Sequence, residues 1–328
     1  MRLRAVLPPL PDELLDALED LGIKTDADLL FSDDAVDLWR KLPDDSITLQ
    51  EVVDLMTRVA AQQAAPMMRG DVLLQEETER CKKRASDALY SGVQALDELV
   101  GGFGQYRVLE ISGDRCSGKT ALALQIVLRY LSGCANSSAV WIDTTGDFSA
   151  DRVHQIMRDD GSLEALERLQ VSLAFELEAV QGVLESAQYS LNLEPKANIR
   201  CIVIDSITPL FRPLLSVVSS QGHSLMTTFM RRLREFAEMY SLTILIINST
   251  SKASPRNPDS VFAFTNRKPA LGPSFTFLTD ATLWLSRIER PSQDSDTLHV
   301  AEVLRSRRAQ SHRWCPFRIL DGVLIPFR

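Results

Sequence analysis

Eight consecutive residues carry the strongest signal in this chain: Gly113-Asp114-Arg115-Cys116-Ser117-Gly118-Lys119-Thr120. They match the spacing G-x-x-x-x-G-K-[ST], which background residue frequencies produce in roughly one in a hundred chains of this length. An apolar segment, Arg107–Ser112, precedes the match, and a helical pattern over Ala121–Tyr130 follows it. Because the motif binds phosphate only between a strand and a helix, these surroundings strengthen the prediction of a phosphate-binding loop.

Each residue type in the loop has a physical reason. Glycines let the backbone N–H groups of residues 113–118 curl around phosphate oxygens, and the following helix adds positive charge at its N-terminus. Lys119 would place its charge on the β- and γ-phosphates, and the Thr120 hydroxyl would reach a magnesium ion. The loop therefore predicts ATP and Mg²⁺ as cofactors.

A second part of the site is Cys201-Ile202-Val203-Ile204-Asp205-Ser206, an apolar strand that ends in a carboxylate. In nucleotide-binding sheets such an aspartate orients the magnesium shell, so Asp205 is expected to act with Thr120. Many strands end in aspartate simply because it suits a turn. The upstream loop nevertheless favours the functional interpretation.

Six apolar segments rich in β-branched residues read as strands, and helical patterns separate most of them. They are Arg107–Ser112, Ala139–Asp143, Leu169–Leu173, Ile199–Asp205, Leu242–Ile247 and Ala281–Ile288. Continuous apolar runs indicate strands covered on both faces, so we predict an α/β fold: a mostly parallel twisted sheet with helices on both faces. Two more strands, near Leu298–Leu304 and Phe317–Ile325, are expected to close the chain as a hairpin.

The chain has 328 residues, which suggests about two domains. Residues 1–65 carry 6 basic and 14 acidic side chains, a net charge of 6 − 14 = −8, and read as a small all-α N-terminal domain. Residues 66–88 show no sustained apolar period and read as a linker. Residues 89–328 hold the predicted P-loop ATPase core.

Local patterns predict four short helices in residues 1–65. Asp12 is expected to cap the first helix, and Gly22 to end it. Thr25-x-x-Asp28 and Thr48-x-x-Glu51 have the spacing of capping boxes, and Trp39 is expected to anchor a short helix between them.

Composition excludes several classes of protein. Apolar runs are far shorter than the ~20 residues that a membrane span needs, and the N-terminus lacks the apolar core of a signal peptide. The five cysteines are scattered without a CxxC pair, which predicts a reducing compartment and no zinc knuckle or disulfide framework. The overall net charge of −8 argues against a protein that coats DNA indiscriminately. It does not exclude a local basic strip on the surface.

At three places the chain resembles RecA-type recombinases. Tyr90–Gly102 looks like the lead-in to their phosphate loop, Val140–Thr144 like their second strand, and Ile246–Asn248 like the strand before their second DNA-facing loop. An acidic helical cap before this core resembles the eukaryotic Rad-fifty-one group and its paralogues. Two stretches, Gly22–Leu29 and Arg267–Phe275, resemble the D-type branch of that group.

The resemblance covers essentially the whole chain and implies a RecA-like core in a nuclear protein of homologous recombination. Such paralogues bind ATP and single-stranded DNA and work in hetero-complexes that help the main recombinase assemble on DNA. The expected partners are the C-type paralogue, through the N-terminal domain, and the XRCC-type paralogue, through the ATPase core.

Two departures from the family pattern bear on mechanism. Active recombinases have a glutamate after the second strand that polarises the attacking water, and Thr145 stands at that place here. A threonine cannot act as a general base at neutral pH. Asp143 and Asp147 lie two residues away on either side, so either would need a shifted loop. Ser249 replaces a glutamine that senses the γ-phosphate. We therefore expect tight nucleotide binding with weak, DNA-dependent hydrolysis at most.

The linker departs as well. Recombinases polymerise through a Phe-x-x-Ala tether between cap and core, and residues 62–88 contain no phenylalanine. This favours an end-capping or hetero-complex role over long homofilaments. Met67-Met68 or Val72-Leu73-Leu74 could equally replace the tether.

The expected DNA contacts lie in the core. The cap has a net charge of −8, and its loop Leu42-Pro43-Asp44-Asp45-Ser46 is acidic, so it is predicted to bind protein rather than DNA. Two segments correspond to the family's DNA-facing loops, Phe211–His223 and Thr250–Pro273, the second expected to be mobile. Cations next to Phe262 and Phe264 suit backbone tracking and base stacking, whereas a merely solvated loop is the alternative. The candidate cations are Arg212, Lys252, Arg256, Arg267 and Lys268.

Other features have simpler interpretations. The arginines of 305–318 read as a charged edge strand or as an extension of the DNA path, with the first slightly favoured. Helix His223–Tyr240 reads as a core helix, with Arg231, Arg232 and Arg234 mainly toward solvent. Rival functions are an autonomous DNA-dependent ATPase with strand-exchange activity, and a RecA-fold ATPase without a DNA role.

Overall fold

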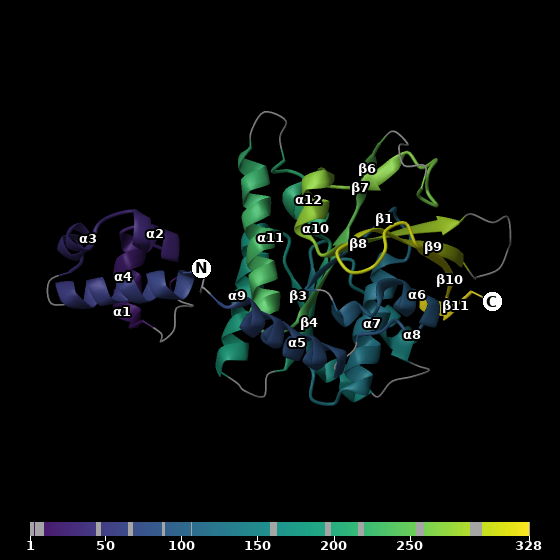
Figure 1. Cartoon of the computed structure of the whole chain (residues 1–328), viewed down its shortest axis with the longest axis horizontal. Helices are drawn as coiled ribbons and strands as arrows, with labels where there is room; N and C mark the ends of the chain where they lie inside the picture. Colours follow the sequence, from purple (N-terminus) through teal and green to yellow (C-terminus); the bar gives the residue numbers. More distant parts are fainter. Residues whose placement is uncertain are drawn as a thin grey trace. The chain divides into compact units, whose positions relative to one another are not determined.

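The computed structural model describes residues 3, 10–43, 47–64, 68–86, 89–105, 107–157, 163–193, 198–215, 220–253, 259–288 and 297–327. It divides the chain into two compact units, Met1–Gln75 and Glu76–Arg328. Figure 1 labels their helices and strands in chain order.

The first unit consists of short helices, as the sequence predicts. They are α1 (Asp12–Asp20), α2 (Asp26–Phe31), α3 (Ala35–Lys41) and α4 (Leu49–Gln63). Thr25 and Thr48 each accept a hydrogen bond from the third helical N–H, and Asp28 and Glu51 reach back to the capping residues. Both predicted capping boxes are confirmed. The core of this unit is Leu3, Leu10, Leu14, Leu15, Leu18, Ile23, Leu29, Leu38, Leu42, Val52, Leu55 and Val59.

One detail of this unit differs from expectation: Asp12 is the first helical residue of α1 rather than its cap, and Pro11 stands at the cap position. Trp39 is 42% exposed, but its Nε1 donates to the Ile47 carbonyl over 3.0 Å and so anchors α3 to the segment before α4, as predicted. Leu38 takes the buried position on α3. Gly22 ends α1 with φ +80, as predicted.

Helix α5 (Gly70–Ser86) occupies most of the segment expected to be a linker, and the division between the two units falls inside it. The sequence gives no apolar period here because the helix buries little of its surface. Within the second unit, the Glu77 carboxylate lies 3.4 Å from Arg107 and 3.7 Å from Arg308. Ion pairs therefore connect the middle of α5 to residues that flank β1 (Val108–Gly113) and β9 (Thr297–Ser306).

In the described part of the second unit, a nine-stranded sheet runs in the order β11-β10-β9-β8-β1-β5-β4-β2-β3. The pairs from β8 to β3 are parallel, and those from β8 to β11 are antiparallel. The predicted mostly parallel sheet is confirmed (Figure 1). The strands are β1 (Val108–Gly113), β2 (Ser138–Asp143), β3 (Leu169–Leu173), β4 (Ile199–Asp205), β5 (Thr243–Asn248), β8 (Ala281–Ile288), β9 (Thr297–Ser306), β10 (Trp314–Leu320) and β11 (Val323–Pro326).

The C-terminal strands correct one prediction. Phe317–Ile325, expected to be one strand, is divided between β10 and β11 by a turn at Asp321 and Gly322, whose φ angles are 50 and 86. Asp-Gly suits the left-handed turn of a tight hairpin, so the sequence does contain the signal. The structure also has a separate short hairpin, β6 (Thr250–Lys252) with β7 (Arg267–Pro269), that the sequence reading missed.

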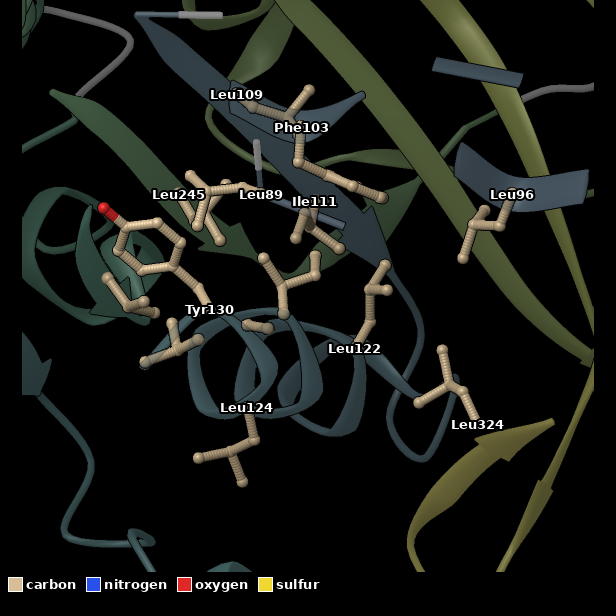
Figure 2. Close-up of a cluster of buried hydrophobic side chains, with 14 of the residues drawn as sticks. Leu89, Leu96, Phe103, Leu109, Ile111, Leu122, Leu124, Tyr130, Leu245 and Leu324 are labelled. Atoms are coloured by element: carbon tan, nitrogen blue, oxygen red, sulfur yellow. The ribbon is translucent and has the colours of Figure 1, made fainter. Parts of the chain in front are cut away.

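Helices cover both faces of the sheet, as predicted, and each face has its own apolar cluster. One cluster includes side chains of α6 (Gln94–Val100), α7 (Lys119–Gly133) and α8 (Ala150–Met157). Figure 2 shows part of it, with Leu122 and Tyr130 on the side of α7 that faces Ile111 and Leu109 of β1. The other cluster includes α9 (Leu177–Leu193), α10 (Ile207–Phe211), α11 (Gln221–Met239) and α12 (Gly272–Leu278). Short 3-10 turns lie at Phe103–Gln105 and Leu163–Arg168.

Helix α11 is a core helix, as expected, with Met226, Phe229 and Leu233 buried. Arg231 and Arg232 face solvent, but Arg234 is partly buried and pairs with Asp280, contrary to the prediction. No helix in the described ranges has the length and apolar character needed to cross a bilayer.

Asp280 provides a test of how the sheet is held together. Asp280 is 8% exposed. Its carboxylate accepts hydrogen bonds from the N–H groups of Arg107 (3.0 Å) and Val108 (3.2 Å) and pairs with Arg234. Asp280→Ala would leave two amides and a guanidinium without this acceptor. We expect it to lower the free energy of unfolding by about 2–4 kcal/mol in urea titrations followed by circular dichroism.

The matched control is Asp151→Ala, at an exposed position of α8, which should change the free energy of unfolding by at most about 0.5 kcal/mol. Equal effects of the two substitutions would contradict the structural role of Asp280.

Candidate nucleotide-binding site

The loop of residues 113–118 connects β1 to α7, so the sheet and the helix that the sequence predicts around it are both present. Two glycines are required by space and conformation. A Cβ on Gly113 would lie 2.2 Å from the Leu285 carbonyl oxygen, and Gly118 has φ +93 with Ile319 Cδ1 2.6 Å from its hypothetical Cβ. The loop is therefore pressed against β8 and β10, and its path leaves no room for larger residues.

Lys119 points back into this loop. Its Nζ donates to the carbonyl oxygens of Gly113 (2.9 Å) and Asp114 (2.6 Å). Burial lowers the pKa of Lys119, and the carboxylates of Asp205 and Asp114 oppose that shift. An ammonium surrounded by neutral carbonyls and distant carboxylates is well placed to exchange those carbonyls for anionic phosphate oxygens.

Thr120 and Asp205 meet although 85 positions separate them in the chain. The Thr120 hydroxyl donates to Asp205 Oδ2 over 3.0 Å, from the first turn of α7 to the end of β4. Burial, with a smaller contribution from the Asp143 carboxylate, raises the pKa of Asp205 to about 6, against the hydrogen bond from Thr120. A hydroxyl and a buried carboxylate are the hard oxygen ligands that Mg²⁺ prefers, and a cation there would favour ionised Asp205, so the pair fits the predicted metal.

Thr144 holds the end of β4 in place, a role that sequence reasoning missed. Its N–H donates to the Asp205 carbonyl (2.8 Å), and its hydroxyl donates to the Ser206 carbonyl (2.6 Å) and accepts from the Ser206 N–H (2.8 Å). Its place directly after β2 is the available sequence signal. Thr144 thus positions the Asp205 carboxylate through the backbone.

Thr145, the next residue after Thr144, uses its backbone and side chain to hold Asp143. Thr145 donates its N–H (2.9 Å) and its hydroxyl (3.1 Å) to Asp143, which also accepts from the N–H groups of Gly146 and Phe148 (both 2.9 Å). Burial raises the pKa of Asp143, but the N–H groups of Thr145, Phe148 and Gly146 outweigh it, and the net shift is downward. Asp143 therefore shapes the loop, while Asp147 remains exposed.

A buried polar network lies behind the loop, and sequence reasoning missed it too. Glu110 of β1 is fully buried and accepts from Ser112 (2.8 Å), Thr282 (2.8 Å) and Asn248 Nδ2 (2.7 Å). Burial raises the pKa of Glu110, against these three hydrogen bonds. Asn248 Oδ1 accepts from Thr208 (2.7 Å), so the network joins β1, β5, β8 and α10. The signal in the sequence is an acidic residue inside an apolar strand.

His299, to which the sequence gave no role, also contacts the loop. Its Nδ1 lies 3.0 Å from the Ser117 carbonyl oxygen and its Nε2 lies 2.7 Å from the Thr297 hydroxyl. The ring is 2% exposed and stacks on Phe317 with ring centroids 5.4 Å apart. β9, through His299, thereby contacts the phosphate loop, and Phe317 of β10 packs against the histidine ring.

The structure brings together part of the candidate DNA-binding set. Lys252 and Arg267 are register partners in the β6–β7 hairpin and therefore lie on one face of it, whereas Lys268 pairs with Ser251 on the other face. All three are exposed. Arg212 lies on another element, at the end of α10, and Arg256 lies outside the described residues.

The segment Thr250–Pro273, expected to be a mobile loop throughout, contains this hairpin and the start of α12. Backbone pairing at its two ends is the reason. Phe264 is 97% exposed, whereas Phe262 packs against Trp284 with ring centroids 6.4 Å apart. One of the two aromatic side chains is thus free for a stacking partner.

The prediction of a charged edge strand is wrong: Arg305 and Arg318 lie on β9 and β10, which are inner strands of the described sheet, and the other arginines of the set lie between these two strands. Arg305 donates to the carbonyls of Thr276 and Thr279 (both 2.9 Å) at the end of α12. Arg307 lies 3.8 Å from Asp280. These local contacts explain the two arginines without a DNA path.

Comparisons with known proteins show which family this chain resembles. The family model described as Rad51 matches residues 83–291. "DNA repair protein RAD51 homolog 4" of Bos taurus is 28% identical over 293 residues, which cover 86% of this chain and 84% of that protein. The protein of that name from Mus musculus is 26% identical over 297 residues, with 88% and 85% covered. A crystal structure of the RadB recombinase covers 73% of this chain and 100% of its own, with a TM-score of 0.57 and 23% identity.

The likeness to RadB concerns the fold and confirms the predicted RecA-like α/β core. The family match spans the loop of residues 113–120, the strand that ends in Asp205, and the β6–β7 hairpin. The chain belongs to the Rad51 family.

Proposed function

We propose that this chain is an ATP-binding recombinase paralogue of homologous recombination repair. It binds single-stranded DNA within a hetero-oligomeric paralogue complex and assists assembly of the main recombinase filament. Family membership supports the recombination role, and two mammalian relatives are named as DNA repair proteins. Their shared name supports the D-type branch, and repair of chromosomal DNA implies the nucleus. We propose the division into residues 1–65, a linker of 66–88, and the core of 89–328.

The contact between Thr120 and Asp205 carries the proposal of ATP and Mg²⁺ as cofactors. Their oxygens lie 3.0 Å apart at the end of a loop whose lysine also points inward. We assign the phosphates to the N–H groups of residues 113–118 and to Lys119, and the metal to Thr120 and Asp205. Bound Mg²⁺ would neutralise charge on the β- and γ-phosphate oxygens.

We expect weak ATP hydrolysis because three carboxylates of the site already accept hydrogen bonds from the protein. Asp143 accepts four hydrogen bonds from its own loop, Asp205 accepts from Thr120, and Glu110 accepts from three side chains. Thr145 supplies no base. The protein therefore holds a triphosphate rather than turning it over, and nucleotide acts as an assembly signal.

One observation favours a second candidate function, the autonomous DNA-dependent ATPase with strand-exchange activity. Asp147 is exposed, two residues after Thr145, and its carboxylate is the one in this loop that Thr145 and Gly146 do not occupy. A shift of the loop would let it serve as the base.

The β6–β7 hairpin and the loop beyond it support single-stranded DNA as a ligand. Lys252 and Arg267 sit opposite each other, an arrangement that like charges disfavour and a phosphate would stabilise. Phe264 is almost wholly exposed, and base–aromatic stacking is worth about 1–3 kcal/mol per base. We retain Arg212, Arg256 and Lys268 as further candidate contacts.

Protein partners are supported by exposed apolar surface in each unit. β3 is an edge strand on which Leu173 is 64% exposed, and Phe175 just beyond it is 60% exposed. Such an edge is a template for pairing with another chain, so we propose that the core binds the XRCC-type paralogue.

In the first unit Phe31 is 84% exposed and Trp39 is 42% exposed. Because this unit is acidic, its exposed apolar side chains suit a protein partner better than DNA. We assign the C-type paralogue to it. Residues 44–46 of its predicted acidic loop lie outside the described residues, as does Met67. Leu73 and Leu74 on α5 are 51% and 69% exposed and stay a candidate replacement for the tether.

The proposed reason for weak hydrolysis can be tested at position 145. Thr145→Glu should raise ATP turnover on single-stranded DNA by about tenfold to a hundredfold, at or below the lower end of the range of about 10²–10⁴ that a well-placed base contributes. Phosphate-release kinetics measure the change. Thr145→Gln is the matched control and should give no rise.

Lys119→Ala should abolish nucleotide binding in either background, as measured with a fluorescent ATP analogue. Brisk wild-type turnover that Thr145→Glu does not increase would instead favour Asp147 as the base.

DNA binding can be tested by salt dependence. Lys252→Ala removes one phosphate contact, so the slope of log affinity against log salt for an oligothymidylate should fall by about 0.7. Phe264→Ala should weaken binding by about 1–3 kcal/mol with little change in that slope. Fluorescence anisotropy measures both. Arg231→Ala, an exposed arginine of α11, is the control, and an equal loss there would show that the hairpin has no special role.

The β3 edge can be tested by adding charge. Leu173→Glu should weaken binding of the core's protein partner at least about tenfold, or 1.4 kcal/mol, with an unchanged melting temperature. Co-purification and titration with the XRCC-type paralogue measure this. Gln170→Glu adds the same charge to another exposed position of β3. Unaltered partner binding by Leu173→Glu would move the interface elsewhere on the core.

A further inference from the structure

One residue of the phosphate loop touches both proposed ligand sites. Asp114 Oδ1 accepts from the Thr250 hydroxyl over 2.5 Å and lies 3.5 Å from Arg267 Nε. Thr250 and Arg267 are the end residues of β6 and β7. The carbonyl oxygen of the same aspartate accepts from Lys119 Nζ over 2.6 Å. Asp114 therefore contacts the phosphate-binding lysine with its backbone and the candidate DNA-binding hairpin with its side chain.

We propose that Asp114 is a positioning residue that links nucleotide binding to strand binding: it holds Arg267 back from DNA until a triphosphate engages Lys119. This inference rests on the proposed function, because it assumes both ligands. It adds the means by which one site would sense the other in a chain whose γ-phosphate-sensing position holds Ser249.

The base of the hairpin is fixed independently of Asp114. The Ala270 N–H donates to the Ser249 carbonyl over 2.9 Å, and Asn248 Nδ2 donates to the Ala270 carbonyl over 3.1 Å and to buried Glu110 over 2.7 Å. β5 and β1 thus anchor one end of the hairpin. In the part of the chain that the structure describes, Asp114 joins the phosphate loop to the hairpin through Thr250 and Arg267, so a change in the loop can reach Arg267 through it.

Charge gives the direction of the effect at the DNA side. Arg267 faces Lys252 across the hairpin, and the Asp114 carboxylate offsets part of their combined positive charge. The side chains of Arg267 and Asp114 are 42% and 43% exposed, so a phosphate of a single strand can reach the guanidinium from solvent. That phosphate must compete with Asp114 for Arg267. Weakening the aspartate's hold therefore strengthens strand binding.

The nucleotide supplies that weakening. Lys119 Nζ has three N–H donors, and the Gly113 and Asp114 carbonyls accept from it, so binding both the β- and the γ-phosphate takes at least one donor away from these carbonyls. In this inference the carbonyl that is released is that of Asp114. The backbone at Asp114 then loses a hydrogen bond that fixes its position, and the carboxylate's contact with Arg267 loosens. By linkage, the same coupling makes a bound strand tighten the nucleotide by an equal factor.

The experiment measures the affinity of a labelled oligothymidylate for the full-length chain, with and without the magnesium complex of a non-hydrolysable ATP analogue. In the wild type, the analogue should tighten strand binding by about two- to fivefold, the scale of one partly exposed ion pair. Asp114→Asn should bind the strand without nucleotide about as tightly as the loaded wild type, and the analogue should add less than about 1.5-fold. Asp151→Asn removes the same charge at an exposed position of α8, outside the hairpin and the phosphate loop, and should keep the wild-type ratio.

Thr250→Val is a second variant that cuts the other contact of the carboxylate without changing charge, and it should also reduce the ratio. The melting temperature should stay within a few degrees of wild type in all variants, and each variant should still bind the analogue, which separates a loss of linkage from misfolding. A wild-type nucleotide effect that survives unchanged in both Asp114→Asn and Thr250→Val overturns the role of Asp114 and leaves the proposed function intact. A wild type that binds no strand in either state overturns both.

Discussion

The hydrogen bond between Thr120 and Asp205 sets the geometry of the whole site, because it joins the first turn of α7 to the end of β4. Neighbouring contacts preserve that meeting point. Thr144 bonds both the N–H and the carbonyl of Ser206, the residue after Asp205, and His299 of β9 contacts the Ser117 carbonyl of the loop. Parallel central strands bring the carboxylate and the loop to one edge of the sheet, and the antiparallel C-terminal strands support the loop there.

The same contacts separate holding a nucleotide from hydrolysing it. A catalytic base needs a carboxylate that is free to take a proton from water. Here the Asp143 carboxylate accepts four hydrogen bonds from its own loop. Thr145 donates two of them, one from its N–H and one from its hydroxyl, and a glutamate at this position would lack the hydroxyl. The replacement at position 145 thus removes the expected base and binds the nearest carboxylate more firmly.

Much of this was readable from the sequence, and the misses have physical reasons. The phosphate loop, Asp205 and the parallel strands follow from motif spacing and from apolar runs, both of which are local patterns. Helix α5 has little apolar periodicity, so no local pattern predicts it. The split between β10 and β11 depends on Asp321-Gly322, a two-residue turn inside an otherwise mostly apolar run. Contacts such as Asp114 with Thr250, Glu110 with Asn248, and His299 with Ser117 join residues far apart in the chain. Such contacts depend on strand order, and no short window of sequence contains them.

The most direct test of the central claim follows the fate of one bound nucleotide. The full-length chain, or its complex with a paralogue partner, is loaded with γ-labelled ATP and Mg²⁺, freed of excess nucleotide, mixed with single-stranded DNA and quenched over time. If the chain holds ATP without a competent base, the label stays in ATP long after the strand has bound, and free phosphate appears only slowly. If label is released as phosphate as fast as the strand binds, the protein is a working ATPase and the account of Thr145 and Asp143 is wrong.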